Sequence, residues 1–255
     1  MGHSTLLEVC VDSFASAMAA VQGGADRLEL CSCLQVGGLT PDPALLEQIR
    51  RETAIPIRCL MRPRFGDFCY SERELELLQA QIPRLREAGA DGFVLGCLTP
   101  DGCLDAGNLR PLLEAAQGLG LTLHRAFDVA RDPVEAMEAA AQLGFDTVLT
   151  SGQARDCWAG RTCIENLLRL ELPIAIMAGG GVNAGVIHRM TDLMDLRCFH
   201  MSGKVIRGSA MIFRRSGVPM GLPGLDEFSI WQTDEEAVRA AAQCLRQKYK
   251  EDTPC

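Results

Sequence analysis

The stretch Ala88-Gly-Ala-Asp91 joins a helical segment to a short apolar run, and its recurrence decides the fold. Gly23-Gly-Ala-Asp26 and Leu143-Gly-Phe-Asp146 have the same form. Glycine is common just after a helix because it adopts a left-handed backbone conformation at little steric cost. Each of these joints therefore marks the end of a helix and the start of a strand, which indicates a repeated βα unit.

Outward from these joints, short apolar runs alternate with longer amphipathic segments along the chain. The runs that we expect to form strands are Leu6–Val11, Arg27–Cys31, Pro56–Met61, Gly92–Cys97, Leu121–Phe127, Thr147–Thr150, Pro173–Ala178 and Cys198–Met201. The segments expected to be helical are Ser13–Gln22, Pro43–Glu52, Glu72–Glu87, Asn108–Gln117, Pro133–Gln142, Cys163–Leu170, Ala184–Leu193 and Thr233–Tyr249. Asp12, Asp42, Ser71 and Thr233 are the expected helix caps.

Eight strands alternating with eight helices in 255 residues predict an α/β fold of the TIM (β/α)8 barrel type. A doubly wound open sheet is the alternative, but the strict alternation favours closure. No linker interrupts the pattern, so we expect one domain over residues 1–255, with the strands within 6–202. The glycine- and proline-rich segment 203–232 is predicted to be a long loop that serves as a lid or a subunit contact, before a closing helix over 233–249.

The composition argues against several classes of protein. The net charge of −8 disfavours a nucleic-acid or anionic-membrane partner. No apolar run reaches the roughly 18 residues that span a bilayer, and Met1–Thr5 lacks the features of a signal peptide. The 12 cysteines include no C-x-x-C pair and fall mostly within apolar runs, where free thiols behave as small hydrophobic side chains. We therefore expect a cytoplasmic protein with reduced cysteines.

Polar side chains share one face of several expected strands. They are Glu8, Cys10 and Asp12; Arg27, Glu29 and Cys31; Arg58 and Arg62; Thr122, His124 and Asp128; and Cys198, His200 and Ser202. The opposite face carries apolar residues such as Leu7, Val9 and Leu28, which are suited to pack under helices. Because barrel strands alternate between the interior and the helix layer, we expect the polar face to line the interior. It forms either a structural ion-pair network or a site at the strand ends, where barrel enzymes carry their chemistry.

The candidate catalytic residues are Glu8, Glu29, Arg62, His124, Asp128 and His200. Glu8 or Glu29 would act as a general base if burial raises its pKa, and His124 would transfer a proton. Arg62 would hold an anionic group through its planar guanidinium. Asp128 would orient Arg125 or His124, or bind a hydroxyl group.

Two turns suit an anionic ligand. Ala178-Gly-Gly-Gly181 follows the seventh expected strand, and Ser202-Gly203-Lys204 follows the eighth. In many TIM barrels these loops bind phosphate through backbone N–H groups and a helix N-terminus; the alternative is that both are simply tight turns. The candidate substrate-binding residues are Arg125, Ser151, Gly179, Gly180, Gly181 and Ser202, although Arg125 lies on the opposite strand face from His124.

Cys10 and Cys31 fall on adjacent expected strands, on the same face as the glutamates. Two thiolates placed in this way suit Cu(I), which is a soft ion. The alternative is that both cysteines are ordinary core thiols.

Eight short motifs together resemble the CutC family of copper homeostasis proteins. They are Leu7–Cys10, Arg27–Cys31, Gly37–Pro41, Met61–Arg64, Gly66–Ser71, His124–Asp128, Leu149–Gly152 and Ala178–Val182. The resemblance implies a TIM barrel, a cytoplasmic location, a homo-oligomer (dimer or tetramer) and a role in copper handling, with copper on Cys10 and Cys31. One position departs from the family pattern, because Cys198 stands where the family usually has an acidic residue, two positions before the histidine of strand eight.

Two functions are therefore expected as alternatives. The first is a copper homeostasis protein that binds copper ion. The second is a TIM-barrel enzyme, of the proton-transfer, isomerisation or lyase type, that acts on a small anionic or phosphorylated substrate at the barrel mouth. A purely structural role of the polar interior is the third interpretation.

Overall fold

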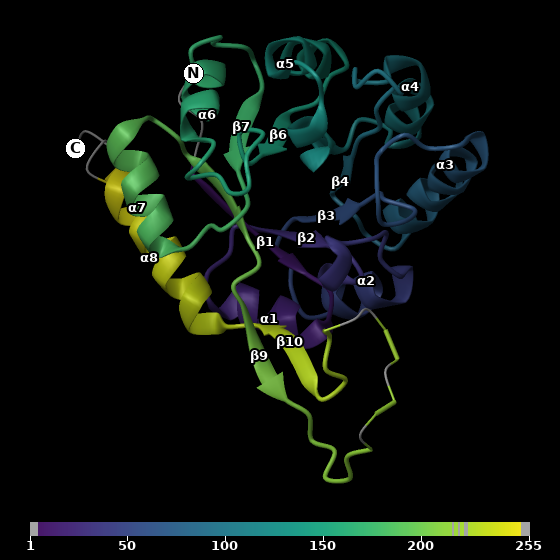
Figure 1. Ribbon diagram of the computed structural model, residues 1–255, viewed down its shortest axis with the longest axis vertical. Coiled ribbons are helices and arrows are strands. Elements are labelled where there is room, and N and C mark those ends of the chain that lie inside the picture. Colours follow the sequence, from purple (N-terminus) through teal and green to yellow (C-terminus); the bar gives the residue numbers. More distant parts are fainter. Residues whose placement is uncertain (1–4, 216, 219, 222–223, 251–255) are drawn as a thin grey trace.

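The computed structural model describes residues 5–215, 217–218, 220–221 and 224–250. Parallel strands close into a barrel in chain order, with helices around it (Figure 1). The strands are β1 (Leu6–Val11), β2 (Arg27–Leu30), β3 (Ile57–Leu60), β4 (Gly92–Leu95), β5 (Gly120–Leu123), β6 (Thr147–Thr150), β7 (Ala175–Ala178) and β8 (Cys198–Met201). In β1, Glu8 lies opposite Arg27 of β2 on one side and His200 of β8 on the other. This closure confirms the predicted TIM barrel.

The barrel helices are α1 (Phe14–Gln22), α2 (Pro43–Arg50), α3 (Glu72–Glu87), α4 (Ala106–Ala115), α5 (Pro133–Gln142), α6 (Arg161–Leu168), α7 (Ala184–Leu193) and α8 (Glu235–Lys250). Short 3-10 helices, η1 (Leu34–Val36) and η2 (Arg125–Val129), follow β2 and β5. Ser71 starts α3 with a capping box and Asp42 caps α2, both as expected, whereas Ser13 rather than Asp12 caps α1. Within the described residues, no helix combines the length and the apolar character needed to cross a membrane.

The fifth strand ends at Leu123, whereas the prediction extended it to Phe127. The Nδ1 atom of His124 accepts a hydrogen bond from the amide of Ala126 at 3.2 Å, and this cap starts η2. The chain therefore leaves the strand at the histidine, and strand alternation no longer decides where Arg125 and Asp128 point. The prediction of a strand through Phe127 was wrong for this reason.

The segment predicted to be a loop contains an antiparallel pair of strands, β9 (Lys204–Gly208) and β10 (Ser229–Thr233). We call the described residues among 204–233 the arm. It extends away from the barrel past α1 (Figure 1), and the amide of Thr233 anchors it to Ser16 Oγ at 3.2 Å. Because Thr233 belongs to β10, the cap of α8 is Asp234, whose carboxylate accepts from the amide of Ala237, and not Thr233.

Buried side chains confirm the alternation of the strands. Leu7, Val9 and Leu28 belong to the main core beneath the helices. Two smaller clusters on the other strand face fill the interior: Cys31, Leu60 and Val94 in one, and Leu149, Met177 and Cys198 in the other. Along β3 and the residues after it, Arg58, Leu60 and Arg62 occupy successive levels of that interior. Apolar packing therefore separates the predicted polar face into an amino-terminal part and a carboxyl-terminal part.

Arg58 fills the amino-terminal end of the barrel. Its guanidinium donates to the Asp146 carboxylate at 2.7 and 2.9 Å and to Thr122 Oγ1 at 2.6 Å. A Cβ atom on Gly120 would lie 2.4 Å from Arg58 Nη2, so the absence of a side chain there makes room for the guanidinium. The structural interpretation of the polar face therefore holds at this end of the barrel.

Candidate functional site

A cavity of about 370 Å³ opens at the carboxyl ends of the barrel strands. The predicted site residues that line it are Cys10, Glu29, Arg62, His124, Arg125, Gly180, Gly181, His200 and Ser202. The predicted residues that lie outside its lining are Glu8, Cys31, Asp128, Ser151 and Gly179. The fold thus brings most of the predicted residues to one cavity and leaves the others outside its lining.

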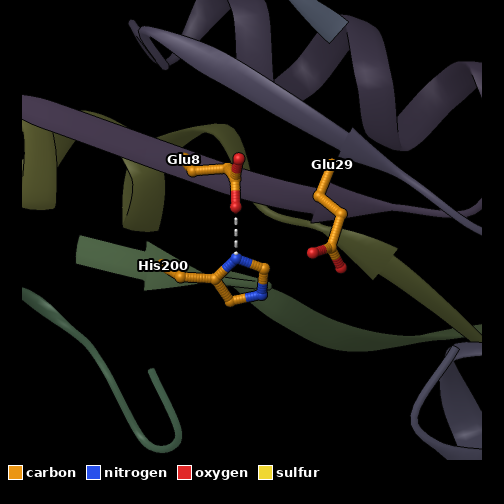
Figure 2. Close-up of side chains that lie close together, drawn as sticks. All are labelled: Glu8, Glu29 and His200. Atoms are coloured by element: carbon orange, nitrogen blue, oxygen red, sulfur yellow. Dashed lines mark hydrogen bonds and ion pairs between the residues drawn. The ribbon is translucent and has the colours of Figure 1, made fainter. Parts of the chain in front are cut away.

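Glu8, Glu29 and His200 converge from β1, β2 and β8 (Figure 2), and Glu29 and His200 line this cavity. Glu8 Oε1 lies 2.8 Å from His200 Nδ1, and Glu8 Oε2 accepts from Arg27 Nε at 2.5 Å. Burial by itself would raise the pKa of Glu8, but Arg27 and His200 outweigh it and lower the pKa to about 2. Glu8 is therefore ionised at neutral pH, and its negative charge is compensated by Arg27 of β2 and His200 of β8.

The two other members of this group have pKa values raised above the usual range. Burial opposes a charge on His200, but the neighbouring Cys10, Glu29 and Glu8 raise the pKa of His200 well above its ordinary value. Burial raises the pKa of Glu29 to about 7, with Glu8 adding to the shift and with His200 and Arg27 opposing it. A fixed carboxylate beside a carboxyl group that titrates near neutrality is an arrangement suited to proton transfer.

Arg62 and His124 form a second part of the wall, with Phe68 between them. The guanidinium carbon of Arg62 lies 5.1 Å from the centre of the Phe68 ring, and the His124 ring centre lies 4.9 Å from it. Arg62 also donates to backbone carbonyls of the segments that follow β2 and β3, at 3.0–3.2 Å. Burial and the charge of Arg62 lower the pKa of His124 to about 3, so the imidazole is neutral.

Asp128 organises the segment after β6 instead of entering the cavity. Its carboxylate accepts from the hydroxyl of Thr150, from the amides of Ser151 and Gln153, and from Arg125 Nε at 2.6 Å. Arg125 also donates to Ser151 Oγ at 2.9 Å. Of the roles expected for Asp128, this geometry favours the orientation of Arg125, which reaches the cavity wall because η2 redirects the chain.

The turn after β7 places Gly180 and Gly181 on the cavity wall, both in the left-handed region with φ of +88° and +75°. The carbonyl of Gly180 accepts from the amide of Cys157 at 3.0 Å, which holds the turn in place. The absence of a side chain at Gly179 allows Leu149 to pack closely against the turn, since a Cβ atom there would lie 2.6 Å from Leu149 Cδ1.

The two predicted copper ligands have different surroundings. Cys10 lies on the cavity wall and interacts with His200. Cys31 is fully buried, and its thiol donates to the carbonyl of Val11 at 3.5 Å. Burial and the neighbouring Cys10 raise the pKa of Cys31 well above its usual value. Cys198 packs in the apolar interior cluster and does not line the cavity at the mouth, so it provides no third thiol there.

In the described part of the chain, the group of metal-ligating side chains that come closest together is Glu8, Glu29 and His200, whose ligand atoms lie within 4.8 Å of one another. Carboxylate and imidazole ligands of this kind suit harder ions than Cu(I). The sequence offered no spacing signal for this group, because β8 becomes a neighbour of β1 only when the barrel closes.

Phe68 and Lys204 are cavity residues that the sequence did not single out as site residues. Phe68 lies between β3 and α3 in a segment without a periodic pattern. Lys204 was noticed only as part of a turn; it begins the arm, and its Nζ lies 3.7 Å from the centre of the Trp231 ring. The arm therefore contributes a cation to the rim of the cavity.

Fold and site together define a (β/α)8-barrel protein whose mouth holds buried acidic, basic and thiol groups. The CutC family model matches residues 5–205. A family protein CutC of Vibrio parahaemolyticus is 40% identical, over 95% of this chain and 99% of the length of that protein. The human copper homeostasis protein cutC homolog is 42% identical, over 92% of this chain and 86% of the length of that protein. This chain belongs to the CutC family.

A solved structure of a CutC protein agrees with this assignment. The crystal structure of CutC from Streptococcus agalactiae matches with a TM-score of 0.74 and 30% identity, over 78% of this chain and 98% of that one. The crystal structure of KGPDC from Streptococcus mutans matches with a TM-score of 0.58 at 13% identity, over 97% of this chain and all of that one, and it shows only a shared fold.

Proposed function

We propose that this protein takes part in copper handling by binding Cu(I) through Cys10 and Cys31. The observation that carries the proposal is the position of Cys10 on the cavity wall. Cys31 follows the end of the neighbouring strand β2, and its thiol interacts electrostatically with Cys10. The amide of Cys31 donates to the carbonyl of Val11 at 3.0 Å, which aligns the two cysteines along the same interior face. Thiolates are the ligands that select Cu(I). Membership of the CutC family and the name of the human relative support this function.

Copper binding at these residues is coupled to proton release, because a metal-bound thiol must lose its proton. Burial makes ionisation of Cys31 unfavourable in the free protein. The copper affinity is therefore expected to rise with pH, as protons become easier to displace.

The test is an anaerobic titration of the reduced protein with Cu(I) in competition with a chromophoric chelator. Exposed Cys33 and Cys69 are first replaced by serine, since accessible thiols bind Cu(I) without being part of a site. In this background we expect one tightly bound equivalent, and we expect Cys10→Ser with Cys31→Ser to abolish it.

The matched control is Cys244→Ser, which removes a partly buried thiol of α8 that does not line the cavity. It should bind copper as the background protein does. Unchanged affinity in the double variant would refute the proposal, and loss in Glu29→Gln alone would move the site to the carboxylate–histidine group.

We also propose that the protein acts in the cytoplasm as a homo-oligomer. The cysteines of the described residues are free thiols, which supports a reducing compartment. The arm carries exposed apolar side chains, among them Met211 (58% exposed), Ile212 (98%) and Phe213 (64%). Contiguous apolar side chains of this size are usually covered by a partner. A second copy of the chain is the occupant that we propose.

A further inference from the structure

Three buried polar atoms at the barrel mouth lack a hydrogen-bond partner in the described part of the chain: Glu29 Oε2, Arg62 Nε and His124 Nε2. All three residues line the same cavity, and their exposed fractions are 5%, 8% and 4%. Buried polar groups are nearly always paired, and an exception calls for an explanation. Because all three residues line one cavity, a bound molecule could supply the missing hydrogen-bond partners.

His124, which lines the cavity, carries a hydrogen-bond donor without a partner among the described residues. Its Nδ1 accepts from the amide of Ala126 at 3.2 Å, so the proton of the neutral ring lies on Nε2. The ring is held against Phe68, and a Cβ atom on Gly96 would lie 2.9 Å from it, so glycine is needed there to seat the imidazole.

Arg62 presents a second donor and an uncompensated charge. Its two Nη atoms donate to the carbonyls of Val36, Gly38 and Gly66, which leaves the Nε–H group free for a ligand. Within the described residues, these acceptors are neutral and no carboxylate forms an ion pair with this guanidinium. A buried cation without a counter-ion is costly, so an anion is the ligand group that suits this position.

The rest of the cavity fits the same class of ligand. Arg125 and Lys204 add positive charge to the wall, and Gly180 and Gly181 expose backbone there without side chains. Glu29 supplies an acceptor, which a hydroxyl group of the ligand would satisfy. A cavity of about 370 Å³ is within the range of small-molecule sites.

We propose that the barrel mouth binds a small hydroxylated organic anion, with a carboxylate or phosphate group on Arg62 Nε and His124 Nε2 and a hydroxyl group donating to Glu29. Cys10 lines the same cavity, but the groups that we propose to contact the anion are Arg62, His124 and Glu29, and neither Cys10 nor Cys31 is among them.

The test uses copper-free protein, with binding measured by calorimetry and by the shift of the melting temperature. Malate and succinate form a pair that differs by one hydroxyl group, and glycerol 3-phosphate and glycerol form a pair that differs by the anionic group. We expect binding of malate, of glycerol 3-phosphate or of both, with the better anion identifying the ligand class. Succinate should bind about tenfold more weakly than malate, since it leaves Glu29 unpaired.

Two variants address the donors. Arg62→Gln removes the charge, and His124→Phe keeps a ring against Phe68 while it removes the N–H group. Each should weaken binding by roughly tenfold or more. Arg73→Gln removes the same charge from the exposed surface of α3 and should bind as the wild type does. His124→Phe keeps the test open if Arg62→Gln fails to fold.

The outcome also separates this proposal from the copper proposal. The variant that lacks Cys10 and Cys31 should retain anion binding, and Arg62→Gln should retain Cu(I) binding. If none of the anionic probes binds to the wild-type protein, or if His124→Phe binds them unchanged, the proposal is overturned.

Discussion

At the scale of single residues, identical positions in the strand pattern acquire different roles from their surroundings. Glu8 and Glu29 both face the barrel interior from neighbouring strands, yet the pKa of Glu8 falls to about 2 and that of Glu29 rises to about 7. The difference follows from the partners, because Glu8 lies between Arg27 and His200 while Glu29 has an unpaired oxygen. Residue type and spacing could not predict this division.

His124 makes the stability of the protein depend on pH. Its pKa in the folded state is about 3, below the ordinary value of 6.5, so the unfolded chain binds a proton more readily than the folded protein. The stabilisation is complete above pH 6.5 and is lost as the pH falls towards 3. Between pH 7.5 and pH 5.0, the wild type should lose about 2 kcal/mol of unfolding free energy from this group.

This loss is measured by urea denaturation of the wild type, His124→Phe and His124→Gln at both pH values. Glu29, whose pKa is raised, has the opposite effect on stability in the same pH range, so the comparison is made between the proteins. On going from pH 7.5 to pH 5.0, the change in unfolding free energy of both variants should be more favourable than that of the wild type by that amount, whatever their absolute stability. If the three proteins lose stability in parallel, His124 is not the group responsible.

At the scale of the elements, local signals predicted helices better than strand ends. Ser71 and Asp42 cap their helices as expected, because a cap depends on a few neighbouring residues. The end of β5 was mispredicted, since the strand was expected to continue through His124 and Arg125 to Phe127, whereas the side chain of His124 turns the chain into η2. The strands of the arm also went unrecognised, because short strands in a glycine- and proline-rich segment give little periodic signal.

Gly120 tests how tightly β5 packs against Arg58 at the amino-terminal end of the barrel. Gly120→Ala would place a methyl group against the guanidinium, and should displace it from Asp146. We expect a loss of about 1–3 kcal/mol of unfolding free energy, measured by chemical denaturation. Gly208→Ala is the control, since nothing lies within 4 Å of a Cβ atom there. Equal losses in both variants would show that Arg58 adapts without cost.

At the scale of the whole molecule, barrel closure creates the site and the arm alters the surface. Closure brings His200 of β8 beside Glu8 of β1, although 192 positions separate them in the chain. The arm extends the molecule beyond the barrel (Figure 1). Within the described residues, its apolar side chains Met211, Ile212 and Phe213 are exposed.

The proposed assembly is tested by replacing Ile212 and Phe213 with aspartate and measuring the mass in solution by sedimentation velocity. The wild type should sediment as a dimer or tetramer, and the double variant should shift towards a monomer, because buried charges oppose association. Leu77→Asp is the control, since Leu77 is an exposed apolar residue of α3 outside the arm (48% exposed). A monomeric wild type, or a double variant that remains assembled, would contradict the proposal.

The sequence by itself determined the barrel, the order of its elements and the strand face that turns inward. Those features depend on periodicity, on glycine at the helix ends and on caps, which are local. Only the tertiary structure decided that Arg58 is a structural group, that Asp128 supports Arg125, and that Cys10 lines the cavity while Cys31 is buried behind it. The physical reason is that depth in the barrel, burial and the choice of charged partner depend on strands brought together by closure.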